Sequence, residues 1–481
     1  MNRSFFLNLV FLIAINVLIK PFYLFGIDRV VQNTVEDGAY GLYAVFFNWA
    51  YIFVIINDLG IYNFNNKTIA QHQHLLDKYF SNILVLKLLL SIPYLLLLVV
   101  VIKLSGYEWN QFQLLLPIAI NQLLVSLIMY LRSNISSLGY YTLNSVFSVL
   151  DKVLMILICV PLLWISSFSE VFRIEWFIWA QTISLAVTAL GAFLWTFRKV
   201  RYFKLKVNIS FLLVIARQSY PYALIVLLMN VYTRTDAIMI ERLIANGKVE
   251  VEYYVSAFRL FDVANMFGLL FASLLLPMFS TLIKNSLKEL TELYHLGLQI
   301  IIAGTCVGVI AIIFNRQIIM EVLYDNGGYY SGNILGLLMI GFMAVSITHI
   351  TGTLLMAAEQ IKPLNRIFFT AVFLNIGLNF ILIPKYESIG AALTTLITQC
   401  FIGVMEIYLV SKYVGIKISN KIIFKVVVLI LSMVSIGALL GQLSIPWMLN
   451  FTALILLGMI LSFILRLVNI PQLLQLVRQK E

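Results

Sequence analysis

Two matched pairs of polar residues, each set in apolar sequence, are the positions of this chain best suited to bind an anion. Asn16 and Lys20 are four residues apart, and Asn230 and Arg234 repeat that spacing 214 residues later. Residues four apart share one face of a helix. A cation in hydrocarbon costs about 2.5–3.5 kcal/mol on insertion scales, so it usually faces a water-filled cavity or a partner. One Lys and one Arg across a cavity would suit a diphosphate, since Arg offers a planar fork of donors and Lys a compact charge.

Three further charged residues accompany these pairs. Arg259 is a third candidate for the cavity, but Asp262 follows it by three residues, so the two could equally pair with each other. Asp236 lies two residues after Arg234, on another face of the helix. Asp236 and Asp262 are therefore candidates to take and release a coupling proton or Na⁺. Each charge could instead neutralise a buried partner, and the sequence leaves that alternative open.

The other charges inside apolar stretches have a simpler interpretation. Asp151 and Lys152 are adjacent, while Lys87 and Glu406 each stand alone in an apolar run. We expect these four residues to form local pairs or to reach toward the membrane surface along their aliphatic stems.

The elements that must position these residues are membrane-spanning helices. The hydrophobic fraction of the 481 residues is 61% and the charged fraction 11%, against about 25% charged residues in soluble domains. About 14 apolar runs are long enough to cross a bilayer, and they are continuous rather than alternating, which favours helices over a barrel. The sequence predicts an all-α polytopic membrane protein. The expected spans are residues 5–31, 40–60, 81–104, 112–131, 143–166, 175–197, 211–240, 252–279, 294–314, 331–357, 365–384, 389–410, 422–443 and 446–467.

The net charge of +11 is better explained by the orientation of the chain in the membrane than by a nucleic-acid-binding surface. Lys and Arg lie mostly between the spans, whereas a nucleic-acid site would gather them on one surface beside aromatic residues. With these spans, 20 Lys and Arg fall on the side of the N-terminus and 7 on the other side. Because cytoplasmic segments collect basic residues, both termini are expected in the cytoplasm. Membrane lipids are expected partners, and nucleic acid is not.

The sequence lacks the residues that are typical of other functional classes. Cys159, Cys306 and Cys400 all lie in apolar spans, so no disulfide framework is expected. His72 and His74 are two residues apart with no third ligand nearby, and no metal site is expected. We find no Gly-rich phosphate loop and no nucleophile with a base, so we expect neither catalytic residues nor ATP hydrolysis on this chain. No cofactor is expected beyond a coupling ion.

The matched pairs also predict an internal repeat. Ile240-Glu241-Arg242 follows Arg234 much as Ile27-Asp28-Arg29 follows Lys20. We therefore expect two pseudo-symmetric six-helix lobes, residues 1–206 and 207–414, followed by two further spans and a cytoplasmic tail in residues 415–481. Six spans return the chain to the same side, so the lobes have parallel orientation and the substrate site is expected between them near the midplane.

Several short motifs occur in order along nearly the whole chain. They are EDGAYGLY at 36–43, DLGIYNF at 58–64, Tyr220-Pro221, Leu276-Pro277, NFILIP at 379–384 and GAALT at 390–394. This pattern resembles the polysaccharide branch of the multidrug/oligosaccharidyl-lipid/polysaccharide exporter superfamily, the O-antigen and capsular oligosaccharide flippases. The resemblance implies two lobes that open alternately to each side. It also implies transport of an undecaprenyl-diphosphate-linked oligosaccharide to the outer leaflet of a bacterial inner membrane, with polysaccharide polymerase and glycosyltransferases as possible partners.

Three alternatives remain beside that interpretation. A peptidoglycan lipid-precursor flippase would use the same diphosphate chemistry. A drug/cation antiporter of the same superfamily would favour acidic cavity residues, whereas cations outnumber unpaired acids in spans 1, 7 and 8. A membrane glycosyltransferase or polymerase would need large outer loops with catalytic acids or arginines, and the loops at 241–251 and 315–330 are short.

Overall fold

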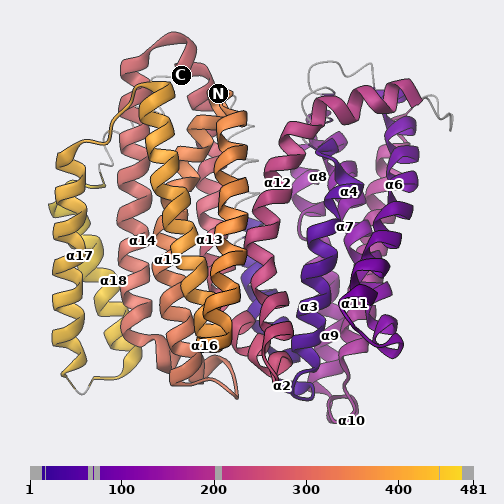
Figure 1. The fold of residues 1–481 in the computed structure, drawn as a ribbon, viewed down its shortest axis with the longest axis horizontal. Helices are drawn as coiled ribbons and strands as arrows, with labels where there is room; N and C mark the ends of the chain where they lie inside the picture. The colour runs from indigo at the N-terminus through magenta and orange to yellow at the C-terminus, as the bar shows by residue number, and fades with distance from the viewer. Residues whose placement is uncertain are drawn as a thin grey trace. The chain divides into compact units, whose positions relative to one another are not determined.

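The structure is a computed structural model in which residues 14–16, 18–62, 65, 69, 76–200, 209–443 and 445–468 are described. It is 88% helical, and its described residues contain no strand (Figure 1). Twelve helices in these ranges are long and apolar enough to cross a membrane. The predicted all-α polytopic fold is therefore confirmed.

The predicted spans correspond closely to these helices, with two particular cases. The helical stretch Ile361–Val414 contains both 365–384 and 389–410, and its backbone leaves the helical region at Glu387, where φ is 52° and ψ is −133°. The first expected span, 5–31, lies only partly within the described residues. His72 and His74 lie outside them altogether.

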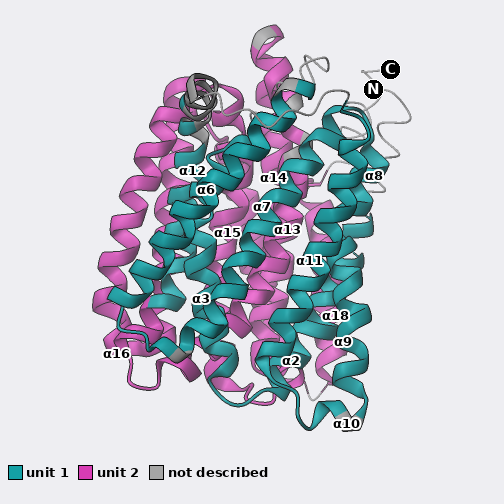
Figure 2. Cartoon of the chain, turned by 90° about the vertical axis from the view of Figure 1, so that its right-hand side faces the viewer, with its two compact units in different colours: residues 1–238 teal, residues 239–481 magenta. Residues whose placement is uncertain are grey.

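The chain forms two compact units, Met1–Ile238 and Met239–Glu481 (Figure 2). The predicted lobes 1–206 and 207–414 rest on a sequence repeat and stay a prediction. Helix α12 (Ile209–Leu243) begins in the first unit and ends in the second. The other main elements of unit 1 are η1 (Leu24–Asp28), α2 (Arg29–Thr34), α3 (Ala39–Phe53), α4 (Ile55–Asp58), α6 (Leu76–Leu104), α7 (Phe112–Ser137), α8 (Tyr141–Phe147), α9 (Leu150–Trp164), α10 (Ser166–Ser169) and α11 (Ile174–Phe197).

The core of unit 1 joins α6, α7 and α11. Phe80 of α6 stacks on Tyr130 of α7 with ring centroids 6.2 Å apart, and it also contacts Phe193 of α11. Ala192 of α11 is buried in the same cluster. The Tyr130 hydroxyl donates to the Phe80 carbonyl at 3.1 Å, so the polar end of this buried ring is satisfied. These contacts fix α7, which carries residues of the candidate site.

After the end of α12, the described residues of unit 2 form six long helices and one short π-helix. They are α13 (Gly247–Asn285), α14 (Leu287–Leu323), α15 (Tyr329–Ala357), α16 (Ile361–Leu409), η4 (Val410–Val414), α17 (Asn420–Gly441) and α18 (Trp447–Ile464). Helix α15 packs against α13, α14 and α16, and 67% of its apolar membrane-spanning segment is buried. Ser286 separates α13 from α14, and its hydroxyl accepts from the Glu289 backbone N–H at 3.3 Å as an N-cap.

The C-terminal hairpin α17–α18 lies beside α14 (Figure 1). Two glycines allow this close approach. A Cβ at Gly437 would lie 2.4 Å from the ring of Phe314, and one at Gly458 would lie 2.7 Å from Val307. Small residues at such contacts are typical of membrane helices, whose association depends on close van der Waals packing.

Candidate functional site

The polar face predicted for the N-terminal helix contacts the junction of α8 and α9. The Asn16 amide donates to Ser148 Oγ at 2.9 Å, and both side chains are buried. Ser148 in turn donates to the Ser145 carbonyl at 2.6 Å. Tyr23 lies on the same face, and the ammonium of Lys152 is 4.7 Å from the centre of its ring. Residues 16, 20 and 23 therefore face the start of α9, which positions Lys20 between two fixed contacts.

Lys20 belongs to a group of charges that includes more than the predicted residues. It lies within electrostatic range of Arg132, Lys152 and Asp151. Lys152 forms an ion pair with Asp151 at 3.0 Å, and Arg132 also lies within electrostatic range of Asp151. We call Lys20, Arg132, Lys152 and Asp151 the cationic cluster. Three cations with one carboxylate leave a formal charge of +2.

Arg132 is held in place by a neighbouring helix. Its Nε donates to Asn144 Oδ1 of α8 at 3.0 Å, and its side chain is partly buried within α7. The exposed fractions are 31% for the Lys152 side chain and 16% for Asp151. These groups are neither sealed in the core nor fully in solvent. Both side chains therefore remain partly exposed.

The excess positive charge of the cationic cluster determines which kind of ligand it would bind. A single carboxylate cannot neutralise three cations, and unit charges about 4 Å apart interact by about 4 kcal/mol at an effective dielectric constant of about 20. A ligand with two negative charges would balance the cluster. Phosphate oxygens accept charge-assisted hydrogen bonds from both Arg and Lys, so a diphosphate satisfies both the charge and the donors.

Arg234 meets a different neighbour within unit 1. Its guanidinium lies 5.1 Å from the ring centre of Tyr51 on α3, a cation–π distance. Asn230, one turn earlier on α12, is partly buried, while Asp236 is completely buried. Lys20 thus lies with α7 and α9, and Arg234 packs on α3.

Arg259 and Asp262 belong to unit 2. Arg259 is 5% exposed, and its Nη1 donates to the Tyr324 hydroxyl at 3.3 Å. Its guanidinium also lies 5.9 Å from the centre of that ring, at the end of α14. Asp262 is partly buried on α13. The predicted site residues are therefore divided between the two units, and their shared role stays a prediction.

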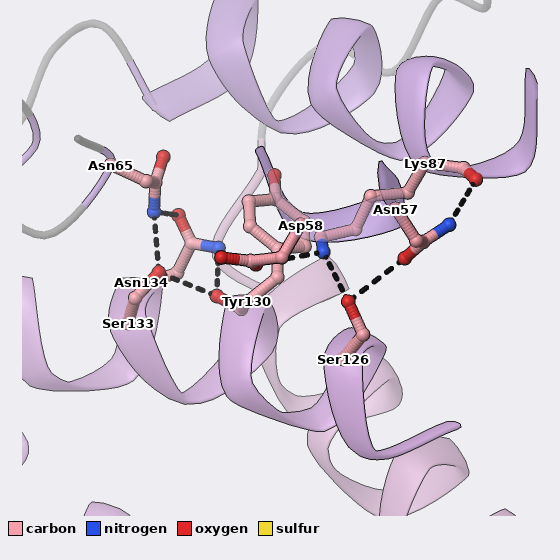
Figure 3. A network of polar contacts seen from close by, with 8 residues as sticks. All are labelled: Asn57, Asp58, Asn65, Lys87, Ser126, Tyr130, Ser133 and Asn134. Carbon is pink, nitrogen blue, oxygen red and sulfur yellow. Dashed lines mark hydrogen bonds and ion pairs between the residues drawn. The ribbon is translucent and has the colours of Figure 1, made fainter. Parts of the chain in front are cut away.

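Lys87 shows how the same fold neutralises a buried cation (Figure 3). Its ammonium lies 3.3 Å from Asp58 Oδ1 and donates to Ser126 Oγ at 2.7 Å. Ser126 donates to Asn57 Oδ1 at 2.8 Å, and the Asn57 amide donates to the Lys87 carbonyl at 2.8 Å. This closed network joins α4, α6 and α7. Lys87 is only 4% exposed, so its role is structural, in contrast with the cationic cluster.

The same view shows a second, neighbouring network (Figure 3). The Asn65 amide donates to Ser133 Oγ at 2.7 Å and to Asn134 Oδ1 at 3.0 Å. Ser133 and Asn134 each donate to the Tyr130 carbonyl. The end of α7 that carries Arg132 is therefore held by hydrogen bonds on a face separate from its contact with α8.

Of the four residues of the cationic cluster, the sequence predicted only Lys20 as a site residue. The expected span 112–131 ends one residue before Arg132, yet α7 continues to Ser137. Lys152 was predicted to pair locally with Asp151, which is confirmed, but its second contact with Tyr23 was not foreseen. The helical continuation of 132–137 is the signal that would have placed Arg132 inside the unit.

Comparison with known proteins gives matches of structure. No protein-family model matches the chain, and no curated protein matches its sequence. Solved structures match it over most of its length. The structure described as the lipid II flippase MurJ in an inward closed conformation is 16% identical, with a TM-score of 0.72, over 96% of this chain and 100% of that one. This chain has the MurJ fold.

Multidrug transporters share that fold less completely. An inward-facing multidrug resistance MATE family transporter of the MOP superfamily is 14% identical, with a TM-score of 0.62, over 82% of this chain and 94% of that one. A MOP superfamily transporter from Pyrococcus furiosus, described by the reverse polarity of its binding pocket, is 13% identical, with a TM-score of 0.57, over 85% and 94%. At these identities the shared property is the fold.

Proposed function

We propose that this chain is a flippase that carries an undecaprenyl-diphosphate-linked oligosaccharide from the cytoplasmic to the outer leaflet of a bacterial inner membrane. The observation that carries the proposal is the cationic cluster of unit 1, with its formal charge of +2 inside a membrane-spanning bundle. The MurJ fold supports it, because that protein is described as a flippase of a lipid. The proposed orientation places both termini in the cytoplasm.

The diphosphate is the part of the substrate that the cluster would hold. Lys20, Arg132 and Lys152 would supply donors, and the prenyl chain would stay in lipid. Such contacts reduce the cost of bringing a charged headgroup into the membrane, which is the main obstacle to flipping. An anion leaving an inside-negative cell gains about 2.3 kcal/mol per charge per 100 mV, so the membrane potential favours export.

The remaining predicted residues have secondary roles in this proposal. Asn230, Arg234 and Arg259 would contact the headgroup as the protein opens alternately to the two sides of the membrane. Asp236 and Asp262 are proposed to bind the coupling ion. Polysaccharide polymerase and glycosyltransferases are the partners expected to use the flipped product or supply the substrate.

A second candidate is the flipping of a peptidoglycan lipid precursor. The specific observation in its favour is the likeness to MurJ, which covers 96% of this chain against 82% for the MATE transporter. This substrate carries the same diphosphate, so the cationic cluster suits it equally well. A cationic drug, in contrast, would be repelled by the cluster.

Ligand binding by the purified full-length chain tests the proposal. Affinity would be measured for a short-chain polyprenyl diphosphate sugar, the corresponding monophosphate and a cationic dye. Lys20→Gln, Arg132→Gln and Lys152→Gln should each weaken diphosphate binding by about 10–150-fold, the equivalent of one charged hydrogen bond of about 1.5–3 kcal/mol. Lys152→Arg should bind nearly normally, and Lys103→Gln, at an exposed end of α6, is the matched control.

Two outcomes would contradict the proposal. If all three glutamine variants bound the diphosphate as tightly as the parent chain, the cluster would be excluded as the binding site. Tighter binding of the cationic dye than of the diphosphate would favour a drug antiporter. Complementation then separates the two lipid substrates. Rescue of a strain lacking its O-antigen or capsule flippase supports the first candidate, and rescue of a strain depleted of its peptidoglycan precursor flippase supports the second.

A further inference from the structure

A carboxyl group with no cationic partner in the described part of the chain is buried in unit 2. Glu406 of α16 is 1% exposed, and the Thr351 hydroxyl of α15 lies 2.6 Å from its Oε2. No Lys, Arg or His among the described residues forms an ion pair with it. A buried carboxylate that lacks a counter-charge is costly, and such a group normally takes up a proton instead.

Two uncharged donors of α15 reach the Glu406 carboxyl: the Thr351 hydroxyl, 2.6 Å from Oε2, and the Gly352 backbone N–H. The Thr351 hydroxyl has one hydrogen, and it lies 3.0 Å from the Ile347 carbonyl as well as 2.6 Å from Glu406. If Glu406 is protonated, its O–H donates to Thr351 Oγ1, and Thr351 donates to the Ile347 carbonyl. If Glu406 is ionised, Thr351 must turn its hydrogen to the carboxylate, and its bond to Ile347 is lost.

Two neighbours shape the pocket around this carboxyl. A Cβ at Gly352 would lie 3.2 Å from both oxygens of Glu406, so the absence of a side chain there lets the carboxyl lie against the backbone of α15. On α14, the fully buried Tyr294 hydroxyl has no hydrogen-bond partner among the described residues, and it lies within electrostatic range of Glu406. Tyr294 is a titratable group on α14 near Glu406, and Thr351 and Gly352 are the neighbours of Glu406 on α15.

We propose that Glu406 is a proton-binding site inside unit 2, at which release of the proton changes the packing of α15 against α16. The protonated acid stabilises the observed packing through the Glu406–Thr351–Ile347 chain. When the proton leaves to water, the carboxylate keeps the Thr351 hydroxyl and the Gly352 N–H as donors, and entering water would supply the rest. Glu406 lies eight residues before the end of η4 at Val414, about 12 Å along a helix.

A role for this proton site in coupling transport would add to the ion binding proposed at Asp236 and Asp262, and it rests on the proposed flippase function. The binding of a proton does not, and the two are tested separately. Infrared difference spectra of the full-length chain in lipid vesicles, recorded between about pH 5 and about pH 10, detect the C=O stretch of a protonated carboxyl that titrates in a range shifted by burial. Glu406→Gln, whose amide can donate to Thr351 in place of the acid, should remove one such band.

Matched variants make that loss specific. Glu321→Gln alters an exposed carboxyl on α14, and Tyr294→Phe removes a hydroxyl that has no hydrogen-bond partner within the described ranges, so both should keep the band. An unchanged band in Glu406→Gln overturns the proton site. Loss of the band on adding Na⁺ at constant pH also overturns it, because it would show that the pocket takes a metal cation.

Transport provides the second arm. In vesicles with an imposed proton gradient, the parent chain should flip a polyprenyl diphosphate sugar faster than without the gradient, and Glu406→Gln should lose that acceleration while still binding the lipid. The same acceleration in Glu406→Gln would overturn the coupling role. If the parent chain flips no such lipid, the proposed function fails, and the infrared result still decides whether Glu406 binds a proton.

Discussion

Replacing Lys87 by Met tests whether the polar network of unit 1 stabilises the fold. The methionine keeps the length of the side chain but removes an ammonium that is 4% exposed and contacts Asp58 at 3.3 Å and Ser126 at 2.7 Å. Asp58 is 24% exposed, so water can reach it once the lysine is gone. The loss should be smaller than for a fully buried pair, about 1.5–3 kcal/mol, the range of hydrogen bonds to charged groups.

Thermal unfolding followed by a thiol-reactive fluorophore measures that loss in the full-length chain. Cys159 is fully buried in α9, so in a background with Cys306 and Cys400 replaced by Ser it reports the unfolding of unit 1. For a unit of this size about 1 kcal/mol shifts Tm by about 2–4 °C, so Lys87→Met should lower Tm by about 3–12 °C. Lys103→Met, at an exposed end of the same helix, should leave Tm unchanged.

The double variant with Asp58→Asn completes the cycle. Because each single change already breaks the pair, the double variant should be less destabilised than the sum of the two, with a coupling of about 0.5–3 kcal/mol. Additive effects, or a Tm of Lys87→Met equal to that of the parent, would refute the structural role assigned to this pair.

Two other predictions concern packing and positioning. Gly458→Val should push α18 away from α14 and destabilise the hairpin contact by about 1–3 kcal/mol. The measurement is thiol labelling of the buried Cys306 of α14, which should become faster. Gly441→Ala, with open space around it, should have no effect. Unchanged labelling in the valine variant would show that this contact is absent. Asn16→Ala should lose the hydrogen bond to Ser148, which contributes about 0.5–1.5 kcal/mol to stability, and should weaken diphosphate binding severalfold. Diphosphate binding equal to that of the parent would show that Asn16 is not part of the site.

The helices were predictable because their signal is local. Continuous apolar runs predicted the spans, and the kink at Glu387 falls in the gap between the expected spans 365–384 and 389–410. The pair of Asp151 with Lys152 followed from adjacency and is confirmed. The partner of Lys87 was not predictable, since Asp58 lies 29 residues away on another helix.

Glu406 shows where sequence reasoning was wrong. It was expected to pair locally or to reach toward the membrane surface, but it is 1% exposed and bonded to Thr351, 55 residues away. The close approach depends on the missing side chain of Gly352, which no pattern around Glu406 reveals. Lys20 was recognised from its spacing, whereas its neighbours Arg132 and Lys152 come from helices distant in sequence.

Flipping of a labelled polyprenyl diphosphate sugar in vesicles containing the purified chain tests the central claim most directly. A quencher added outside removes the signal of the outer leaflet, and any flipped inner-leaflet lipid becomes accessible with time. We predict that the parent chain and Lys152→Arg expose the inner pool, and that Lys152→Gln does so at least about tenfold more slowly, the equivalent of about 1.4 kcal/mol. Equal rates in the parent, Lys152→Gln and protein-free vesicles would contradict the account.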